Sequence, residues 1–330
     1  MYTKKQPIND IKENDRIEDI FVVKIRKGVS TYQREGKTGY FFTLILSDNT
    51  GKSIDYKYWG GENEADVKRI YSSIEDDSVV FIQGYSRMNR FWNRLEIHTN
   101  EPDTIRVLAP GEYDIMEFVK KPKRDIEEMY NELTGFIGSI NNNNIRQLLS
   151  TIFSDPDTAK KFKTHPGAIE YHHNWIGGLL QHTLEVVKYC DLSASMFSDL
   201  DRDIMIAGAI LHDIGKLQEI TVTSRIKGTI DGQLKGHIVM GYAYLSNIMD
   251  KLGTEKDIRD KLLHIMLSHH GKNDFGSPKE PMFPEAVIVY YADELSSKAA
   301  EMIEFKNVSK EETDDDFMFH KRYSKNILLR

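Results

Sequence analysis

Two different spacings of hydrophobic residues divide this chain and predict a β domain followed by a helical domain. Up to about residue 110, runs rich in β-branched and aromatic residues alternate with turn formers, which is typical of strands. Segment 53–59 alternates most regularly, placing Ile54, Tyr56 and Tyr58 on one face. The predicted strands are 21–27, 40–46, 53–59, 79–85 and 95–98, with a short helix within 64–74. This order of strands and helix predicts a five-stranded OB-fold barrel.

Beyond a basic, proline-marked hinge at 120–124, hydrophobic positions recur at steps of three and four residues, which predicts helices. The first contains Ile126, Met129, Tyr130 and Leu133. Further helices are predicted at 143–153, 176–196, 202–212, 237–252, 256–268 and 284–303, with a small hairpin inserted within 219–233. We therefore expect a multidomain α and β protein, divided into an OB-fold domain at 1–110, a linker at 111–124, an all-α domain at 125–305 and a C-terminal tail at 306–330.

Composition narrows the class of protein only slightly. Hydrophobic residues make up 40% and charged residues 29% of the chain, as in ordinary soluble globular proteins. We predict a cytoplasmic protein with no membrane partner. The chain has a single cysteine, Cys190, and it lacks both a signal-peptide pattern and a run of about 20 apolar residues. The net charge of −7 does not exclude a nucleic-acid partner, because local patches govern such contacts.

The segment 211–216 carries the most informative chemistry. His212 and Asp213 stand together at the end of an apolar helix, although such a pair occurs by chance about once in a chain of this composition. His182 lies one turn inside another predicted helix, and Asp293 lies within a third. An unpaired polar group on an apolar face costs several kcal/mol, and one shared cation would satisfy all four residues.

The order His182, His212–Asp213, Asp293 resembles the HD superfamily of metal-dependent phosphohydrolases, an all-helical fold. The resemblance implies that these four residues coordinate a first divalent ion. Individually, each residue has a structural alternative. His182 could be a hydrogen-bonded core histidine, and Asp293 could belong to a buried ion pair.

The same resemblance implies a second ion and two catalytic residues. His237, His269 and His270 match the additional histidines of binuclear members, although His269 and His270 could instead cap a helix. Asp213 would bridge the two ions, and Lys216 would contact the scissile phosphate. Two ions can lower the pKa of a bound water and clamp a phosphodiester for in-line attack. Imidazole and carboxylate ligands favour Mn²⁺, our first choice, or Co²⁺, Fe²⁺ or Zn²⁺.

An OB barrel ahead of an HD domain resembles the YhaM family of bacterial 3′–5′ exoribonucleases, from about residue 11 to about residue 300. The motifs that carry this resemblance are 177–183, 211–216, 236–237, 267–272 and 276–279. Two positions depart from the family pattern. Gln181 stands where glutamate is expected, and Ser296 stands where aspartate is expected. A carboxylate at the second position would orient a metal ligand, so its replacement could change rate or metal preference.

The β domain has the aromatic and basic residues that single-stranded nucleic acids require. The candidate nucleic-acid contacts are Trp59, Arg87, Arg90, Trp92 and Arg94. Half or more of the aromatic residues could instead fill the barrel, because small barrels need bulky interiors.

The sequence thus predicts a metal-dependent phosphodiesterase that degrades single-stranded RNA from the 3′ end, with single-stranded DNA as a second candidate substrate. Direction and exonuclease mode come from the family resemblance alone, which also implies a homo-oligomer. One alternative is an HD phosphohydrolase acting on nucleotides or cyclic dinucleotides. Another is a non-catalytic nucleic-acid-binding protein with a structural metal site.

Overall fold

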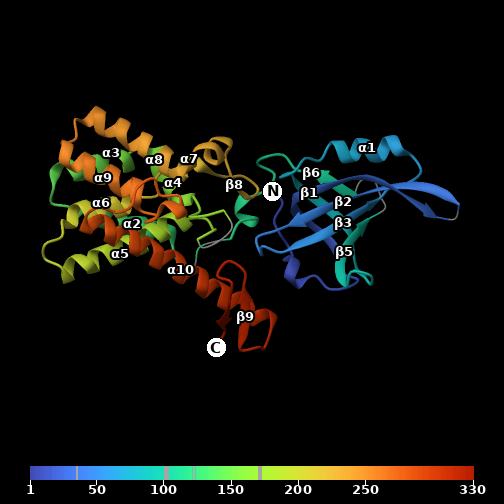
Figure 1. Ribbon diagram of the computed structural model, residues 1–330. Coiled ribbons are helices and arrows are strands. Elements are labelled where there is room, and N and C mark those ends of the chain that lie inside the picture. The colour runs from blue at the N-terminus through green and yellow to red at the C-terminus, as the bar shows by residue number, and fades with distance from the viewer. Residues whose placement is uncertain (35, 100–103, 121, 123, 170–172) are drawn as a thin grey trace. The chain divides into compact units, whose positions relative to one another are not determined.

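The computed structural model describes residues 1–34, 36–99, 104–120, 122, 124–169 and 173–330 (Figure 1). The chain divides into two compact units. One consists of Met1–Lys121 with Val222–Ile226, and the other of Pro122–Thr221 with Lys227–Arg330. In these described ranges, no helix combines the length and the hydropathy that crossing a membrane requires.

The N-terminal unit is built around a closed barrel. Its strands are β1 (Arg16–Arg34), β2 (Lys37–Ser47), β3 (Ser53–Trp59), β4 (Val79–Asn89) and β5 (Arg94–Thr99). They follow the order β1-β2-β3-β5-β4, and β4 pairs back onto β1, which closes the barrel. Only β3 and β5 run parallel among these pairs. This connectivity confirms the predicted OB fold. A further strand, β6 (Ile105–Val107), pairs with β4 and was not predicted.

Alternating side chains fill the barrel as the sequence pattern predicts. Ile54, Tyr56 and Tyr58 of β3 are buried together with the apolar face of β2. Helix α1 (Glu64–Ser72) lies between β3 and β4 in the chain and starts at Asn63, whose side chain accepts hydrogen bonds from two backbone N–H groups. The opposite face of β3 carries Trp59 and remains partly accessible.

The second unit is helical. Its helices are α2 (Ile126–Gly138), α3 (Asn143–Phe153), α4 (Pro156–Thr164), α5 (Gly178–Met196), α6 (Arg202–Leu211), α7 (Lys216–Glu219), α8 (Ile230–Leu252), α9 (Lys256–Ser268) and α10 (Pro284–Glu312). Helices α2, α3, α4 and α6 begin at Asp or Asn residues whose side chains accept N-terminal N–H groups. The sequence pattern missed α4 and α7, because both are short and each buries a single side chain.

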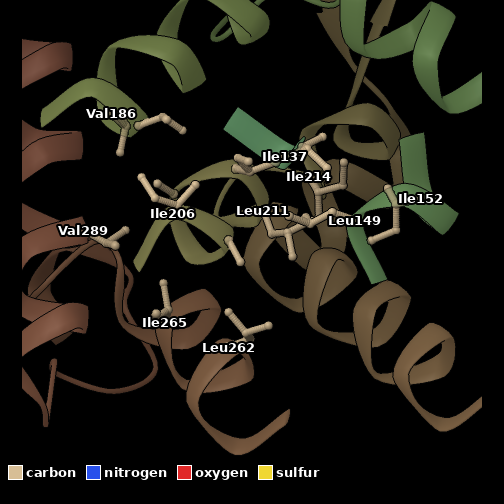
Figure 2. Close-up of a cluster of buried hydrophobic side chains, with 14 of the residues drawn as sticks. Ile137, Leu149, Ile152, Val186, Ile206, Leu211, Ile214, Leu262, Ile265 and Val289 are labelled. Atoms are coloured by element: carbon tan, nitrogen blue, oxygen red, sulfur yellow. The ribbon is translucent and has the colours of Figure 1, made fainter. Parts of the chain in front are cut away.

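Helix α6 lies at the centre of the helical core. Every residue from Ile204 to Leu211 is buried, and Figure 2 shows Leu211 and Ile214 within the same apolar cluster as Ile265 of α9. A helix that is apolar on all sides must be enclosed by other helices. The C-terminal end of α6 therefore lies inside the domain, and so do His212 and Asp213, which follow it.

Two features of the helical unit sharpen the predicted boundaries. The inserted hairpin is present as β7 (Ile220–Val222) and β8 (Ile226–Gly228). Helix α8 then begins earlier than predicted, but Gly236 interrupts it with a positive φ of 73°. The predicted helix at 237–252 corresponds to the part after this break. Glycine permits the break because it has no side chain to clash in the left-handed region.

The C-terminal residues 306–330, predicted as a tail, have regular structure. Helix α10 continues to Glu312, and an antiparallel hairpin follows, formed by β9 (Phe317–His320) and β10 (Lys325–Leu328). The residues that follow the acidic run at 311–316 supply strand pairing and a buried Leu329. Helix α10 and this hairpin form one continuous C-terminal segment (Figure 1).

Candidate metal centre

Three helices bring the first predicted ligand set together. His182 of α5, the His212–Asp213 pair after α6 and Asp293 of α10 are all buried. His182 Nε2 lies 3.1 Å from Asp293 Oδ1 and 3.5 Å from Asp213 Oδ2. His212 Nε2 lies 3.3 Å from the same Asp213 oxygen and 3.2 Å from His182 Nε2. Two imidazole nitrogens and two carboxylate oxygens thus converge on one point.

The second predicted set faces the other oxygen of Asp213. His237 Nε2 and His269 Nε2 lie 3.6 and 3.7 Å from Asp213 Oδ1. One ring nitrogen of each of His237, His269 and His270 lies within 4.8 Å of the others. Asp213 therefore offers one oxygen to each set, which is the arrangement of a carboxylate that bridges two cations.

Three buried polar atoms without hydrogen-bond partners among the described residues indicate whether cations fit these ligand sets. Asp213 Oδ1, His237 Nε2 and His269 Nε2 are buried, and none has a hydrogen-bond partner within the described part of the chain. Their separations of 3.6 and 3.7 Å are too long for hydrogen bonds between them. Buried polar atoms without partners are rare in folded proteins, and a shared cation satisfies all three. The residues fit divalent metal ions.

The outer nitrogens of the ligand histidines are held in one orientation. Nδ1 donates to a backbone carbonyl in His212 (Ala209 O, 2.8 Å), in His269 (Met266 O, 2.8 Å) and in His270 (Phe275 O, 3.1 Å). Each bond leaves the Nε2 lone pair directed at the centre. Burial, reinforced by neighbouring imidazoles, lowers the pKa of His269 well below its ordinary value and also lowers that of His270. Both rings are therefore neutral near pH 7, the form that binds metal.

Ser296, where the resemblance leads us to expect aspartate, connects His182 to a carboxylate. Ser296 Oγ donates to Glu185 Oε2 at 2.6 Å and lies 3.0 Å from His182 Nδ1. Since the hydroxyl proton goes to Glu185, the hydroxyl oxygen accepts the Nδ1 proton of His182. Burial alone would raise the pKa of Glu185, but bonds from His173, Ser296 and Gln181 lower it to about 2. A distant carboxylate thus acts on His182 through a hydroxyl.

Gln181 and His173 belong to the same network. Gln181 Nε2 donates to Glu185 Oε1 at 3.0 Å, and His173 Nε2 lies 3.1 Å from Glu185 Oε2. His173 is fully buried, so it supports Glu185 from inside the domain. The neighbouring His172 lies outside the described residues.

Helix α7 places one charged residue beside each ligand set. Lys216 Nζ donates to Asp213 Oδ2 at 2.7 Å. Glu219 accepts from His237 twice, with Oε2 lying 3.0 Å from the ring Nδ1 and Oε1 lying 3.1 Å from the backbone N. Sequence reasoning missed Glu219, and the available clue was its position three residues after Lys216, on the same helical face.

We expect Glu219→Ala to weaken binding of the second ion by about 10–100-fold, because the orientation of His237 depends on this carboxylate. Calorimetric titration of the metal-stripped protein with Mn²⁺ measures both sites. Gln218→Ala, at the exposed neighbouring position, is the matched control. Two unchanged binding constants in Glu219→Ala would contradict this role.

The centre opens into a cavity of about 850 Å³. Asp213, Lys216, His237, His270 and Asp293 line one side of it. A cavity of this size accommodates a nucleotide-sized ligand.

The structure separates the five predicted nucleic-acid contacts. Trp59 and Arg87 line a groove of about 600 Å³ on the barrel, together with Tyr32, Gln33, Tyr85, His98 and Thr99. Arg90 and Trp92 lie in the turn between β4 and β5, outside the lining of this groove, and Trp92 is 65% exposed. Arg94 Nη2 is paired with Asp55 Oδ2 at 2.9 Å.

The fold and ligand sets define an HD-domain protein with an N-terminal OB barrel, and residues 179–298 match the HD domain family. The chain is 31% identical over 283 residues to the 3′-5′ exoribonuclease YhaM of Geobacillus sp. (strain WCH70), covering 84% of this chain and 81% of that protein. It is 30% identical over 284 residues to the YhaM protein of Halalkalibacterium halodurans, covering 86% and 84%. The chain belongs to the YhaM family of 3′–5′ exoribonucleases.

Among solved structures, the OB domain of Ta0387 from Thermoplasma acidophilum is 16% identical, with a TM-score of 0.24, over 36% of this chain and 92% of that one.

Proposed function

We propose that this protein is a cytoplasmic, metal-dependent phosphodiesterase that shortens single-stranded RNA from its 3′ end. The observation that carries the proposal is the similarity to the YhaM exoribonucleases, which spans 84% of the chain. The two ligand sets that share Asp213 supply the chemistry for this reaction. The aromatic groove of the barrel supplies a binding surface for the strand.

The chain's own residues perform three tasks at the centre. His182, His212 and Asp293 would hold one ion, and the second histidine set would hold the other. Bound divalent ions lower the pKa of water and stabilise charge on a phosphodiester. Asp213 would contribute one oxygen to each ligand set. Lys216, on the cavity wall 2.7 Å from Asp213, is placed to neutralise charge that develops on a phosphate oxygen.

We propose Mn²⁺ as the resident metal. The ligand sets combine imidazole nitrogen with carboxylate oxygen, whereas Ca²⁺ sites consist of oxygen ligands alone. Measuring the metal content of protein purified without added metal, followed by activity after reconstitution with Mn²⁺, Co²⁺, Fe²⁺ or Zn²⁺, ranks the candidates. Higher metal content and activity with Co²⁺, Fe²⁺ or Zn²⁺ than with Mn²⁺ would refute the assignment.

We assign the single strand to the groove that contains Trp59 and Arg87. Trp59 stacks on Phe41 with ring centroids 4.9 Å apart, and its Nε1 donates to His98 Nδ1 at 3.3 Å. These contacts hold the indole ring in place, which lowers the entropic cost of stacking a base on it. Arg87 contributes positive charge for the phosphates. Arg90 and Trp92 would form a second contact at the β4–β5 turn.

The activity is tested with a 5′-labelled oligoribonucleotide and Mn²⁺. A ladder of products that shorten from the 3′ end supports the proposal. Intact RNA together with hydrolysis of nucleotides or cyclic dinucleotides would instead identify a nucleotide phosphohydrolase. Binding of RNA without any hydrolysis would identify a binding protein with a structural metal site.

We expect Trp59→Ala to weaken binding of single-stranded RNA by about tenfold, because stacking contributes roughly 1–3 kcal/mol per base. Fluorescence anisotropy with a labelled oligoribonucleotide measures the affinity. Trp92→Ala is the comparison, since it removes the same side chain from the second proposed contact, outside the groove, and should cost less affinity. If Trp92→Ala costs more affinity than Trp59→Ala, the strand lies along the turn and the groove is misassigned.

A further inference from the structure

The C-terminal hairpin supplies part of the wall of the metal-centre cavity. Arg322 and Tyr323, in the turn between β9 and β10, line the same cavity as Asp213 and Asp293. We propose that this wall is the subsite for the 3′-terminal nucleotide of the RNA, with the Tyr323 ring stacking on its base. This inference rests on the proposed function and adds the residues that recognise the leaving nucleotide.

Glu301 of α10 anchors both hairpin residues. Its buried carboxylate accepts from Arg322 Nη1 at 2.8 Å and from Tyr323 Oη at 2.9 Å, both at Oε2. Burial and the adjacent Glu301 raise the pKa of Tyr323 to about 12, so the hydroxyl keeps its proton and continues to donate. The hydroxyl end of the ring is therefore fixed, while part of the half-buried ring forms the cavity wall.

One oxygen of the same carboxylate has no hydrogen-bond partner among the described residues. Glu301 Oε1 is buried and makes no hydrogen bond to any residue that the structure describes, and the nearest ring nitrogen, His320 Nε2, lies 3.6 Å away. Buried polar atoms normally have partners. A ribose hydroxyl is a donor that would satisfy an acceptor on this wall.

The spacing along α10 relates the hairpin wall to the metal centre. Glu301 follows the ligand Asp293 by eight residues, which corresponds to a rise of about 12 Å along the helix axis. That rise is too long for Glu301 to coordinate the same ion as Asp293. Because Asp293 and Tyr323 line the same cavity, a nucleotide whose phosphate lies at the centre could place its base against Tyr323.

The chemistry of this wall suits an exonuclease. An aromatic ring stacks on any base, because every base has a π face. An enzyme that removes successive nucleotides needs this tolerance at the position of the leaving nucleotide. Arg322 adds a permanent positive charge to a cavity whose lining also includes the carboxylates of Glu219, Glu294 and Glu301.

The test is a cycle that combines one protein change with one substrate change. Wild type and Tyr323→Ala are each assayed by kcat/KM on RNA whose 3′-terminal nucleotide carries a base and on RNA whose terminal nucleotide is abasic. We expect wild type to lose about tenfold on base removal. Tyr323→Ala should lose a similar factor on normal RNA and nothing further on abasic RNA. If base removal costs Tyr323→Ala the same factor in kcat/KM that it costs wild type, the two effects are independent and the proposal is overturned.

Three further variants separate recognition from structure. Tyr323→Phe keeps the ring and should retain the dependence on the base, whereas Tyr323→Leu keeps the bulk without a π face and should lose it. Phe319→Ala removes an aromatic side chain from the same hairpin at a 57% exposed position and should behave as wild type. Independent effects of Tyr323→Leu and base removal would overturn the proposal even if Tyr323→Ala does not fold.

A second substrate distinguishes failure of the proposed function from failure of the proposed subsite. Bis(p-nitrophenyl) phosphate is a phosphodiester without a nucleobase, and its hydrolysis reports the centre alone. A wild-type protein that cleaves this ester but does not shorten RNA would overturn the proposed function and the subsite together. A wild-type protein that shortens RNA with independent effects of Tyr323 and the base would overturn the subsite alone.

Discussion

Replacing Asp213 by Asn is expected to reduce RNA hydrolysis by at least about a thousandfold, which corresponds to roughly 4 kcal/mol of transition-state stabilisation. Asp213 directs Oδ2 at His182 and His212 and Oδ1 at His237 and His269. Asparagine has nearly the same shape, but it is neutral and offers one oxygen instead of two. The change therefore removes the bridge without opening a cavity in the core.

Metal content and single-turnover kinetics measure this effect. Metal analysis after dialysis should show fewer than two ions per chain in Asp213→Asn, and RNA cleavage at saturating protein should slow in parallel. Asp257→Asn, on the exposed surface of α9, is the matched control and should match wild type in both measurements. Turnover that persists in Asp213→Asn, or in the double variant His212→Ala with Asp213→Ala, would show that the centre is misassigned.

Gly215→Ala is expected to disrupt the second ligand set and to lower the free energy of unfolding by about 3 kcal/mol, the upper end of the usual cost of overpacking. A Cβ atom at Gly215 would lie 2.0 Å from His237 O and 2.7 Å from Gly241 N. Both are backbone atoms of α8, so the helix itself must move. That movement carries His237 away from Asp213, and we expect hydrolysis to fall by about a hundredfold.

Chemical denaturation and metal titration separate the two effects of this substitution. The second ion should be lost first, because His182, His212 and Asp293 do not lie on α8. Gly135→Ala is the control, since Gly135 is exposed within α2 and a Cβ there meets nothing within 4 Å. Removing a helical glycine there should stabilise the protein by up to about 1 kcal/mol. Wild-type stability and two bound ions in Gly215→Ala would refute the packing argument.

Local patterns predicted most of the secondary structure because each element buries one regular face. Strand β3 and helices α3 and α9 occur at the predicted residues 53–59, 143–153 and 256–268. The errors arose where such a face is absent or interrupted. Helix α4 buries only Phe162, and Gly236 breaks α8. The C-terminal hairpin was not predicted, because its two strands are only four residues long and follow an acidic run at 311–316.

The residues of the candidate centre likewise fall into those that the sequence indicated and those that it did not. Residue type and order indicated the ligands, since histidine and aspartate on apolar helical faces require a polar partner. Glu219 and Glu185 were not recognised, because glutamates on half-exposed helix positions are common. Ser296 looked like the loss of a carboxylate. Glu185 supplies this carboxylate, because it accepts a hydrogen bond from the Ser296 hydroxyl.

The sequence by itself determined the order of the two domains, the helices that carry the ligands and the metal chemistry, because periodicity and donor type are local properties. Only the tertiary structure decided which oxygen of Asp213 faces which ligand set. It also joined Glu185 to Ser296 across 111 positions and placed Arg322 and Tyr323 on the wall of the metal-centre cavity. Such contacts depend on how helices pack in three dimensions, and no local spacing of residues encodes them.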